Sequence, residues 1–403
     1  MDKRSFIKAM LATAGALPGT RLWASPTGGT ASRFVLVFLR GAYDGLSALV
    51  PYADNFYYES RPNIAIAPPN PDDASAAVLL DGRWGLHPAL ADTALALYSS
   101  GQLALVPFAG TAFVSRSHFQ AQDWMETGLL PQHRPDPSSG FLNRLVAELH
   151  GRTRSPVAVS FTSSLPIVMR GEASIVNTAM QAGRVSAIGG SYEQMLSQLY
   201  VGHPLQRQVN DGLGLRRELA RQHEEEMQSA SRGALAPAGF VLEAARLGKV
   251  MRDNSAYTVA FVDVGGWDTH AGQGAAQGAL AGRLRALGEG VSALRSEMGP
   301  IWDKTVVVVL SEFGRTFREN GSRGTDHGHG TTFWVAGGAI SGGKIAGEQR
   351  PLNPGDLHQG RDVPVANEYR DLLAGLFARM YGLGPTALTR IFPAANPDAL
   401  AIV

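Results

Sequence analysis

The chain contains no cysteine among its 403 residues. Disulfide bonds, thiolate nucleophiles and cysteine-ligated zinc or iron–sulfur centres are therefore excluded. Charge is also scarce, because Asp, Glu, Lys and Arg make up only 18% of the residues and the formal net charge is +1. A chain with so little excess charge has no basic field with which to bind nucleic acid. Its hydrophobic content of 44% is ample for a large folded core.

Long apolar runs are missing as well, since none reaches the roughly 20 residues that a spanning helix needs. The N-terminus has instead the layout of an export signal: a basic start, a weakly apolar run over residues 9–19 and the small-residue exit Ala24-Ser25-Pro26. The string Lys3-Arg4-Ser5-Phe6-Ile7-Lys8 resembles a twin-arginine signal in which Lys3 replaces the first arginine. We predict a signal peptide over residues 1–30 and a periplasmic or extracellular protein with no stable membrane span after its removal. The alternative is a plain amphipathic terminus.

Apolar strand-like runs alternate with helical patterns along the rest of the chain. The run at residues 33–39 is continuous, as is typical of a buried parallel strand. The other predicted strands are 103–108, 156–161, 258–264, 305–310 and 332–336, and the predicted helices are 87–99, 118–126, 141–150, 239–252, 275–298 and 368–381. Residues 342–347 are expected to form a turn and an edge hairpin. This order predicts one α/β domain over 31–403, a mainly parallel, doubly wound sheet flanked by helices, with a helical cap insertion at 165–235.

Polar clusters follow several of these strands, at the edge of the sheet where ligands bind in α/β folds. Asp268 and His270 come just after one strand, and His327 and His329 lie in a glycine-rich loop before another. Carboxylates and imidazoles together suit zinc, iron or manganese, and suit calcium less well. Each pair alone also fits a simpler interpretation, namely a hydrogen-bonded turn for the first and an exposed flexible loop for the second. Together they predict a divalent metal site, with zinc favoured and manganese, iron or calcium as alternatives.

Two further carboxylates are candidates for the same site. Glu312 directly follows a strand, and Asp44 lies in the loop after the first strand. Glu312 could equally be a structural partner of Arg315 or Arg318, and Asp44 could be a helix N-cap or turn residue.

Ser115 and Ser117 precede the helix predicted from residue 118, so either could be its N-cap. A hydroxyl at a helix N-terminus beside a metal is also how a nucleophile for phosphoryl or sulfuryl transfer is activated. Both interpretations stay open at this point.

Five motifs together resemble the exported domain-of-unknown-function 1501 family: Arg40-Gly41-Ala42-Tyr43-Asp44-Gly45-Leu46, Ser117-His118-Phe119-x-Ala121-Gln122, Gly266-Trp267-Asp268-Thr269-His270, Ser311-Glu312-Phe313-Gly314-Arg315-Thr316 and Gly324-Thr325-Asp326-His327-Gly328-His329. The resemblance spans about residues 33–383. It implies the fold of the alkaline phosphatase and sulfatase superfamily, with metals at the carboxyl edge of the sheet.

The resemblance also implies roles for single residues. Asp44 is similar to an aspartate that bridges toward a second metal, and Ser117, or Ser115, to the nucleophile. Asp268, His270 and either His327 or His329 are similar to the ligands of the first metal. Phe313 stands where phosphatases carry a ligand histidine after an aspartate, so a one-metal or altered site is implied. Arg315 could clamp a substrate oxyanion bidentately.

The leading hypothesis is an exported metal-dependent hydrolase of a phosphate or sulfate ester, with Ser117 as nucleophile, Arg315 as anion clamp and a small anionic ester as substrate. A second hypothesis is a non-catalytic exported binding or assembly protein with a degenerate phosphatase-like fold. A third is hydrolysis by a metal-activated water molecule, in which Ser115 and Ser117 are dispensable.

Overall fold

The computed structural model describes residues 32–132, 136–150, 158–178, 198–204, 206, 228–400 and 402. The predicted signal peptide and most of the predicted insertion at 165–235 lie outside these residues. The start of that insertion is described, and it contains the short helix η2 (Ile167–Met169) and the strand β7 (Val176–Thr178), which extends the main sheet. At this end the insertion therefore adds a strand as well as a helical turn.

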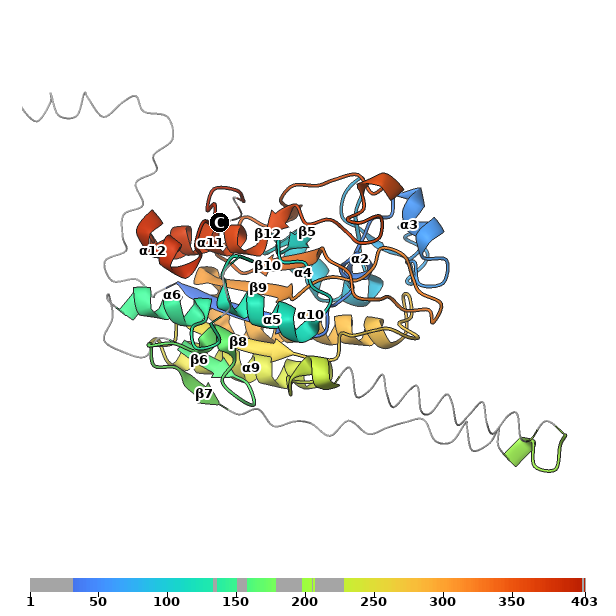
Figure 1. Cartoon of the computed structure of the whole chain (residues 1–403), viewed down its shortest axis with the longest axis horizontal. Helices are drawn as coiled ribbons and strands as arrows, with labels where there is room; N and C mark the ends of the chain where they lie inside the picture. The colour runs from blue at the N-terminus through green and yellow to red at the C-terminus, as the bar shows by residue number, and fades with distance from the viewer. Residues whose placement is uncertain are drawn as a thin grey trace, which may run out of the picture. The chain divides into compact units, whose positions relative to one another are not determined.

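The main sheet has the order β11-β5-β10-β9-β1-β8-β6-β7, with β12 also paired to β5 (Figure 1). Its strands are β1 (Arg33–Leu39), β5 (Leu103–Gly110), β6 (Ala158–Phe161), β8 (Val259–Val264), β9 (Thr305–Ser311), β10 (Thr331–Ala336), β11 (Lys344–Ile345) and β12 (Asn367–Glu368), besides β7. Among the described strands of this sheet, only β10 runs antiparallel to its neighbours, β5 and β9. The predicted α/β fold with a mainly parallel sheet is confirmed.

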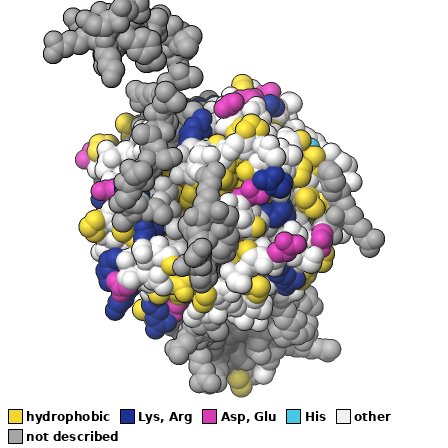
Figure 2. All heavy atoms as spheres, turned by 90° about the vertical axis from the view of Figure 1, so that its left-hand side faces the viewer, with side chains coloured by type: hydrophobic (Ala, Val, Ile, Leu, Met, Phe, Trp, Pro, Cys, Tyr) yellow, Lys and Arg dark blue, Asp and Glu magenta, His cyan; other side chains and the backbone are white. Residues whose placement is uncertain are grey.

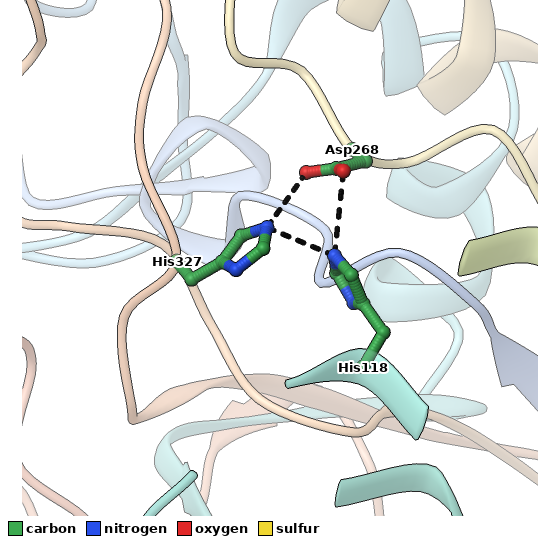
Figure 3. A group of neighbouring side chains, drawn as sticks. All are labelled: His118, Asp268 and His327. Atoms are coloured by element: carbon green, nitrogen blue, oxygen red, sulfur yellow. Dashed lines mark hydrogen bonds and ion pairs between the residues drawn. The ribbon is translucent and has the colours of Figure 1, made fainter. Parts of the chain in front are cut away.

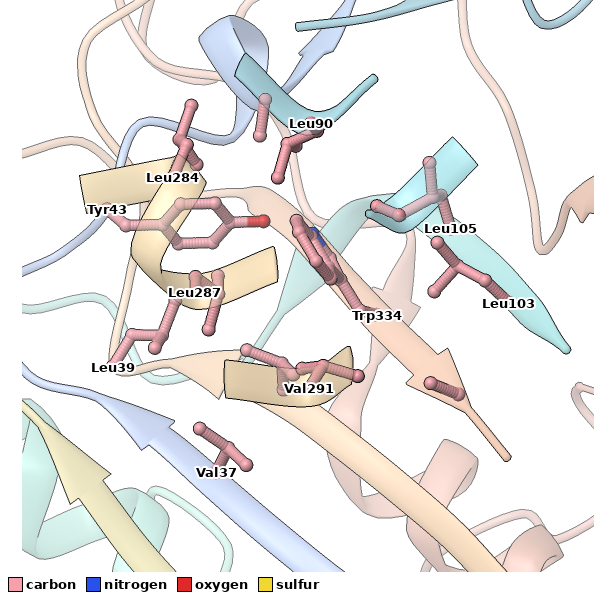
Figure 4. Close-up of a cluster of buried hydrophobic side chains, with 14 of the residues drawn as sticks. Val37, Leu39, Tyr43, Leu90, Leu103, Leu105, Leu284, Leu287, Val291 and Trp334 are labelled. Atoms are coloured by element: carbon pink, nitrogen blue, oxygen red, sulfur yellow. The ribbon is translucent and has the colours of Figure 1, made fainter. Parts of the chain in front are cut away.

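Helices cover both faces of the sheet, as the alternating side chains of β1 show. Val35, Val37 and Leu39 face a core shared with α4 (Ala94–Ser99), α9 (Pro237–Asp253) and α10 (Ala279–Met298). Figure 4 shows part of this core, where Leu284, Leu287 and Val291 of α10 lie over the sheet. The intervening residues Phe34, Leu36 and Phe38 face a second core with α5 (His118–Thr127), α6 (Phe141–His150), α11 (Tyr369–Tyr381) and α12 (Pro385–Ile391). Each buried Val, Leu or Phe contributes about 1.5–3 kcal/mol, so both faces favour this arrangement.

The smaller elements surround the sheet. They are α2 (Gly45–Ala48), β2 (Leu49–Val50), α3 (Asn55–Ser60), β3 (Val78–Leu79), β4 (Gly85–Leu86), η1 (Pro88–Leu90), η3 (Gly299–Lys304) and η4 (Pro354–Asp356). The helix predicted over 87–99 is divided into η1 and α4, and β2, β3 and β4 form a separate small sheet. The hairpin predicted at 342–347 is wrong, because β11 pairs parallel with β5 and the Gly343 amide bonds to the Leu103 carbonyl.

The length and apolar character of the described helices bear on a membrane span, and the charges on one face of the molecule bear on a surface of a single charge. Among the described helices, none is long and apolar enough to cross a membrane. On the face drawn in Figure 2, basic and acidic side chains are interspersed with apolar ones.

The topology brings five chain segments to one edge of the sheet. The parallel strands β1, β8 and β9 end there, and their pairing aligns Leu39 with Val264 and Ser311. β5 also ends there, and β10, being antiparallel, begins there. The loops after β1, β5, β8 and β9 and the loop before β10 therefore meet, and these loops carry the predicted site residues.

Candidate metal centre

Four donor side chains converge at this edge from three loops. Asp268 and His270 follow β8, His327 precedes β10, and His118 is the first residue of α5, which follows β5. Ser117 is the N-cap of α5, and its hydroxyl accepts a long hydrogen bond of 3.5 Å from the Gln120 amide. The cap starts the helix at this point, so the first helical side chain is the one that reaches the cluster.

Three of these residues, His118, Asp268 and His327, have donor atoms that all lie within 4.8 Å of one another (Figure 3). His118 Nε2 is 2.9 Å from His327 Nε2 and 3.3 Å from Asp268 Oδ2. His327 Nε2 is 3.2 Å from Asp268 Oδ1. His270 Nε2 joins the same group, at 2.9 Å from both His327 Nε2 and Asp268 Oδ1. Three imidazole nitrogens of one type thus surround one carboxylate.

The opposite nitrogen of each ring faces a hydrogen-bond acceptor. His118 Nδ1 is 2.8 Å from Glu312 Oε1, and His270 Nδ1 is 3.2 Å from Asp326 Oδ1. His327 Nδ1 is 2.7 Å from the carbonyl oxygen of Arg116. Carboxylate and carbonyl oxygens only accept, so a proton on each Nδ1 satisfies these three contacts. A neutral ring in that tautomer has its lone pair on Nε2, the nitrogen that lies beside Asp268 in all three histidines.

Lone pairs that face each other at 2.9 Å repel unless a positive charge lies between them. The pKa shifts of His118 and Asp268 also indicate that their surroundings favour a positive charge. Burial alone would lower the pKa of His118, but hydrogen bonds to Asp268 and Glu312 and their negative charges raise it to about 9. Burial would raise the pKa of Asp268, but the hydrogen bonds from His118, His270 and His327 hold it well below its ordinary value. A bound cation would be stabilised by the same groups, and it would replace the proton on His118.

The donor set fits a small divalent transition metal. Nitrogen and oxygen ligands of tetrahedral zinc lie at about 2.0–2.2 Å from the ion, which places neighbouring donors about 3.3 Å apart. The observed distances of 2.9–3.3 Å between donor atoms are close to this value. Second hydrogen bonds on every histidine are typical of metal-ligating imidazoles, because they fix the tautomer and the ring orientation. Calcium prefers six to eight oxygen ligands and fits three imidazoles poorly.

Close backbone packing holds the ligand loops in place. Gly41 has a φ of 113°, and a Cβ there would lie 2.9 Å from the Asp268 amide nitrogen. Gly328, next to His327, would place a Cβ 2.4 Å from the carbonyl carbon of Arg315. Gly328 therefore allows the two loops to pack closely. Backbone hydrogen bonds from Gly328 to Gly314 and from Gly314 to His329 join the same loops.

Glu312 and Arg315 lie directly behind the donors. Glu312 is fully buried and accepts from His118, from Gln122 Nε2 at 2.9 Å and from the Gly41 amide at 2.8 Å. Burial would raise the pKa of Glu312, but the hydrogen bond and charge of His118 lower it to about 2. Arg315 is buried too, and its Nη1 donates to Asp268 Oδ1 at 2.5 Å. Its other donors bond to the hydroxyl and carbonyl of Thr325. Glu312 thus positions His118 and Arg315 positions Asp268, and neither side chain is exposed to solvent.

Asp44 has protein partners for its charge. Arg61 donates to its two carboxylate oxygens at 2.6 and 3.1 Å, and Ser47 and Gln273 donate at 2.8 and 2.7 Å. Both Asp44 and Arg61 are buried. Burial would raise the pKa of Asp44, but the guanidinium charge and hydrogen bonds of Arg61 lower it. A guanidinium group thus neutralises the aspartate that the family resemblance assigns to a second metal.

The remaining predicted residues lie around the cluster. Ser115 Oγ donates to Gln120 Oε1 at 3.0 Å and accepts from the Ser117 amide at 3.1 Å, so it braces the loop before α5. His329 is buried with its ring centroid 4.5 Å from that of His358, away from the described donor contacts. Burial, followed by the positive charges of His358 and Arg116, lowers the pKa of His329 to about 4. Of the two loop histidines, His327 is the one in contact with Asp268.

Sequence reasoning missed His118 as a donor. It considered the residue only as part of the motif Ser117-His118-Phe119, in which the serine drew attention as a possible nucleophile. Asp268 is 150 positions away, and no local spacing links the two residues. The available signal was a histidine at the first helical position after a strand, because the end of β5 and the start of α5 lie at the ligand-binding edge.

An α/β protein with a histidine–aspartate cluster that could hold a metal ion, at the carboxyl edge of its sheet, is the class that this geometry defines. The chain belongs to the family described as "Protein of unknown function (DUF1501)", whose model matches residues 31–392. This match confirms the family that the five motifs predicted. No curated protein matches the chain.

Several solved structures share its general architecture. One is a protein in the alkaline phosphatase superfamily from Vibrio parahaemolyticus, with 10% identity, a TM-score of 0.40 and coverage of 94% of this chain and 75% of that one. The lipoteichoic acid synthase LtaP from Listeria monocytogenes has 10% identity and a TM-score of 0.41, covering 93% and 77%. The C-terminal periplasmic domain of EcEptC from Escherichia coli, in a complex with Zn, has 10% identity and a TM-score of 0.39, covering 94% of both chains. Similarity at this level does not assign a reaction.

Proposed function

We propose that this protein is a metal-dependent hydrolase of a phosphate or sulfate ester. The observation that carries the proposal is the convergence of His118, His327 and Asp268, with His270 beside them. Every Nδ1 in the group faces an acceptor, and the Nε2 atoms of His118 and His270 each lie 2.9 Å from that of His327. A structural cluster without a cation would have to hold protons there instead.

The residues of the chain divide into donors, supports and a nucleophile. Asp268, His118, His327 and His270 would hold the ion, which when bound would act as a Lewis acid toward an ester oxygen. Glu312 orients His118, and Arg315 orients Asp268. We propose Ser117 as the nucleophile, because it is adjacent in sequence to His118 and its hydroxyl has only one long hydrogen bond among the described contacts. Attack of the Ser117 hydroxyl on phosphorus or sulfur would form an ester on Ser117 and release the alcohol, which takes up the serine proton; water would then hydrolyse the serine ester and release phosphate or sulfate.

The test is a panel of phosphate and sulfate monoesters and diesters, assayed with the metal-loaded protein. The S117A variant should retain its metal and lose turnover, whereas S115A should retain both. Turnover that survives in S117A with full metal content would refute the serine nucleophile. It would favour attack by a water molecule, and the hydrolase proposal itself would stand.

One observation favours a second candidate, a non-catalytic binding or assembly protein. Arg61 neutralises Asp44, and Phe313 stacks on His118 with ring centroids 5.0 Å apart. Neither Asp44 nor Phe313 is therefore available as a ligand for a second metal ion. This candidate predicts metal binding without turnover of any ester in the panel. A decrease in stability on removal of His118 and His327, with no catalytic defect to measure, would support it.

We also propose that the chain is exported through a twin-arginine-type signal at residues 1–30. The basis is the string Lys3-Arg4-Ser5-Phe6-Ile7-Lys8 and the small residues that end the apolar run. Fractionation of cells that express the full chain would test it: the native protein should leave the cytoplasm, and R4A should retain it there. Equal fractionation of the native protein and R4A would contradict the proposal.

A further inference from the structure

The arginines nearest the metal centre differ in whether a substrate could reach them. Arg315 is completely buried against Asp268, and Arg61 is completely buried against Asp44. Arg40 is buried as well, between Asp263 and Glu126. Each of these guanidinium groups has a carboxylate partner, and none of the three side chains is more than 3% exposed. None of them can leave its partner for a substrate without leaving a buried charge unpaired, which is strongly unfavourable.

Arg116 is different, because its backbone belongs to the metal centre and its side chain is accessible. Its carbonyl oxygen is 2.7 Å from His327 Nδ1, so the residue is one hydrogen bond from a donor. Its side chain is 46% exposed. It also lies between Ser115 and Ser117, in the loop that leads to His118.

The guanidinium group is held in place from one side only. Its Nη2 lies 3.2 Å from Asp362 Oδ2 and 3.0 Å from Gln359 Oε1. Among the described contacts, its Nε and Nη1 donors have no partner. Asp362 is itself buried and fixed, since its backbone pairs with Thr316 and with His358. The group is therefore positioned and still has N–H donors to offer.

The two ends of Arg116 are attached to neighbouring points of one loop. Residue 315 forms an isolated bridge with His327, and residue 316 forms one with Asp362. The Arg116 carbonyl bonds to His327, the partner of residue 315, and the Arg116 guanidinium group bonds to Asp362, the partner of residue 316. This places a fixed, accessible positive charge along the rim of the metal centre.

We propose that Arg116, rather than Arg315, recognises the anionic oxygens of the substrate. The proposal rests on the proposed function and names the residue that selects a phosphoryl or sulfuryl group over an uncharged ester. A guanidinium group suits this task because its planar array of donors matches the oxygens of such groups, and charge-assisted hydrogen bonds are the strong ones.

The experiment measures binding of inorganic phosphate and of sulfate to the metal-loaded full chain by calorimetry. R116Q removes the charge while leaving an amide that can still donate to Asp362, and the backbone carbonyl that holds His327 is unchanged. We expect phosphate and sulfate to bind about 10- to 100-fold more weakly, the loss typical of charged hydrogen bonds, with metal content as in the native protein.

R318Q is the matched control. Arg318 is also an exposed rim arginine, but it donates to the Gly360 carbonyl and lies over the Phe56 ring, without a bond to a donor of the centre. R318Q makes the same change in net charge as R116Q. Because distant charges are screened at physiological salt, phosphate and sulfate affinity should change by no more than about twofold in R318Q. An equal loss in both variants would overturn the specific role of Arg116.

The outcomes separate this inference from the proposed function. If native protein and R116Q bind both anions equally, Arg116 is not the recognition residue, and the hydrolase proposal is unaffected. If the metal-loaded native protein binds neither anion and hydrolyses no ester, both proposals fail. If R116Q loses its metal, the R116K variant is used instead, because lysine keeps the positive charge but lacks the planar array of donors. Weaker binding of phosphate and sulfate by R116K at full metal content supports the proposal. Binding equal to that of the native protein overturns it.

Discussion

The Glu312→Gln variant tests the support behind a metal donor without changing the shape of the side chain. In the structure Glu312 Oε1 accepts N–H groups from His118, Gln122 and Gly41. A glutamine carbonyl can accept all of these. Its amide nitrogen can donate to Ser311 Oγ, which lies 2.8 Å from Glu312 Oε2, while the Ser311 proton goes to the Leu39 carbonyl at 2.7 Å. The variant removes one negative charge and leaves each buried polar group with at least one partner, so we expect it to fold.

The expected effect is on metal affinity. A carboxylate on Nδ1 makes the ligating nitrogen of His118 more basic, and loss of such a partner typically weakens metal binding 10- to 100-fold. This corresponds to about 1.4–2.8 kcal/mol of binding free energy. Zinc affinity should be measured with a metal-buffering chelator above pH 9, because the pKa of His118 is about 9 and protons no longer compete for it there.

Glu126→Gln provides the control for this prediction. Glu126 is equally buried and lies on the same helix as His118, but its partners are Arg40 and the Val168 amide. Its zinc affinity should equal that of the native protein even if its stability falls. The reasoning is refuted if Glu312→Gln binds zinc as tightly as the native protein does, or if Glu126→Gln loses as much affinity.

Two predictions concern buried titratable groups away from the donors. Asp44→Asn leaves the buried Arg61 guanidinium without its countercharge, so we expect the free energy of unfolding in urea to fall by about 3–5 kcal/mol while metal content is unchanged; loss of metal with unchanged stability would instead make Asp44 a ligand. His87 is buried, with Nδ1 accepting from the Ala89 amide and Nε2 near the Ala275 carbonyl, and burial lowers its pKa to about 4 from 6.5. The unfolded chain therefore takes up the proton first, so this contribution to stability is complete above pH 6.5 and is lost as pH falls toward 4, by up to about 3 kcal/mol. His87→Asn keeps an acceptor for Ala89 and should flatten the pH dependence of the unfolding free energy over this window; an unchanged slope would contradict it.

The fold could be predicted to a large extent because the signal is local. The buried strands of the sheet, such as Arg33–Leu39 and Thr305–Ser311, are continuous apolar runs, and the helices between them have clear apolar spacing. The direction of β10 and the parallel pairing of β11 depend on contacts between distant segments, which no local pattern contains.

The site was predictable where donors follow strands directly. Asp268, His270 and His327 were found because they stand beside strands of one sheet. His118 was missed because it is the first residue of a helix, next to a serine that was itself considered as the functional residue. The surroundings of Asp44 could not be foreseen, because Arg61 belongs to none of the predicted elements or motifs and is buried in the structure. Which charged partner a buried carboxylate takes is decided by tertiary packing.

The central claim is that His118, His327 and Asp268 hold a divalent transition metal. The measurement that tests it most directly is elemental analysis of the purified chain beside a His118→Ala/His327→Ala double variant, both after incubation with zinc and removal of excess metal. We predict about one tightly held ion per chain in the native protein, since Asp44 and Glu312 already have protein partners, and none in the double variant. Absence of metal from both proteins after reconstitution, or equal retention by both, would contradict the account.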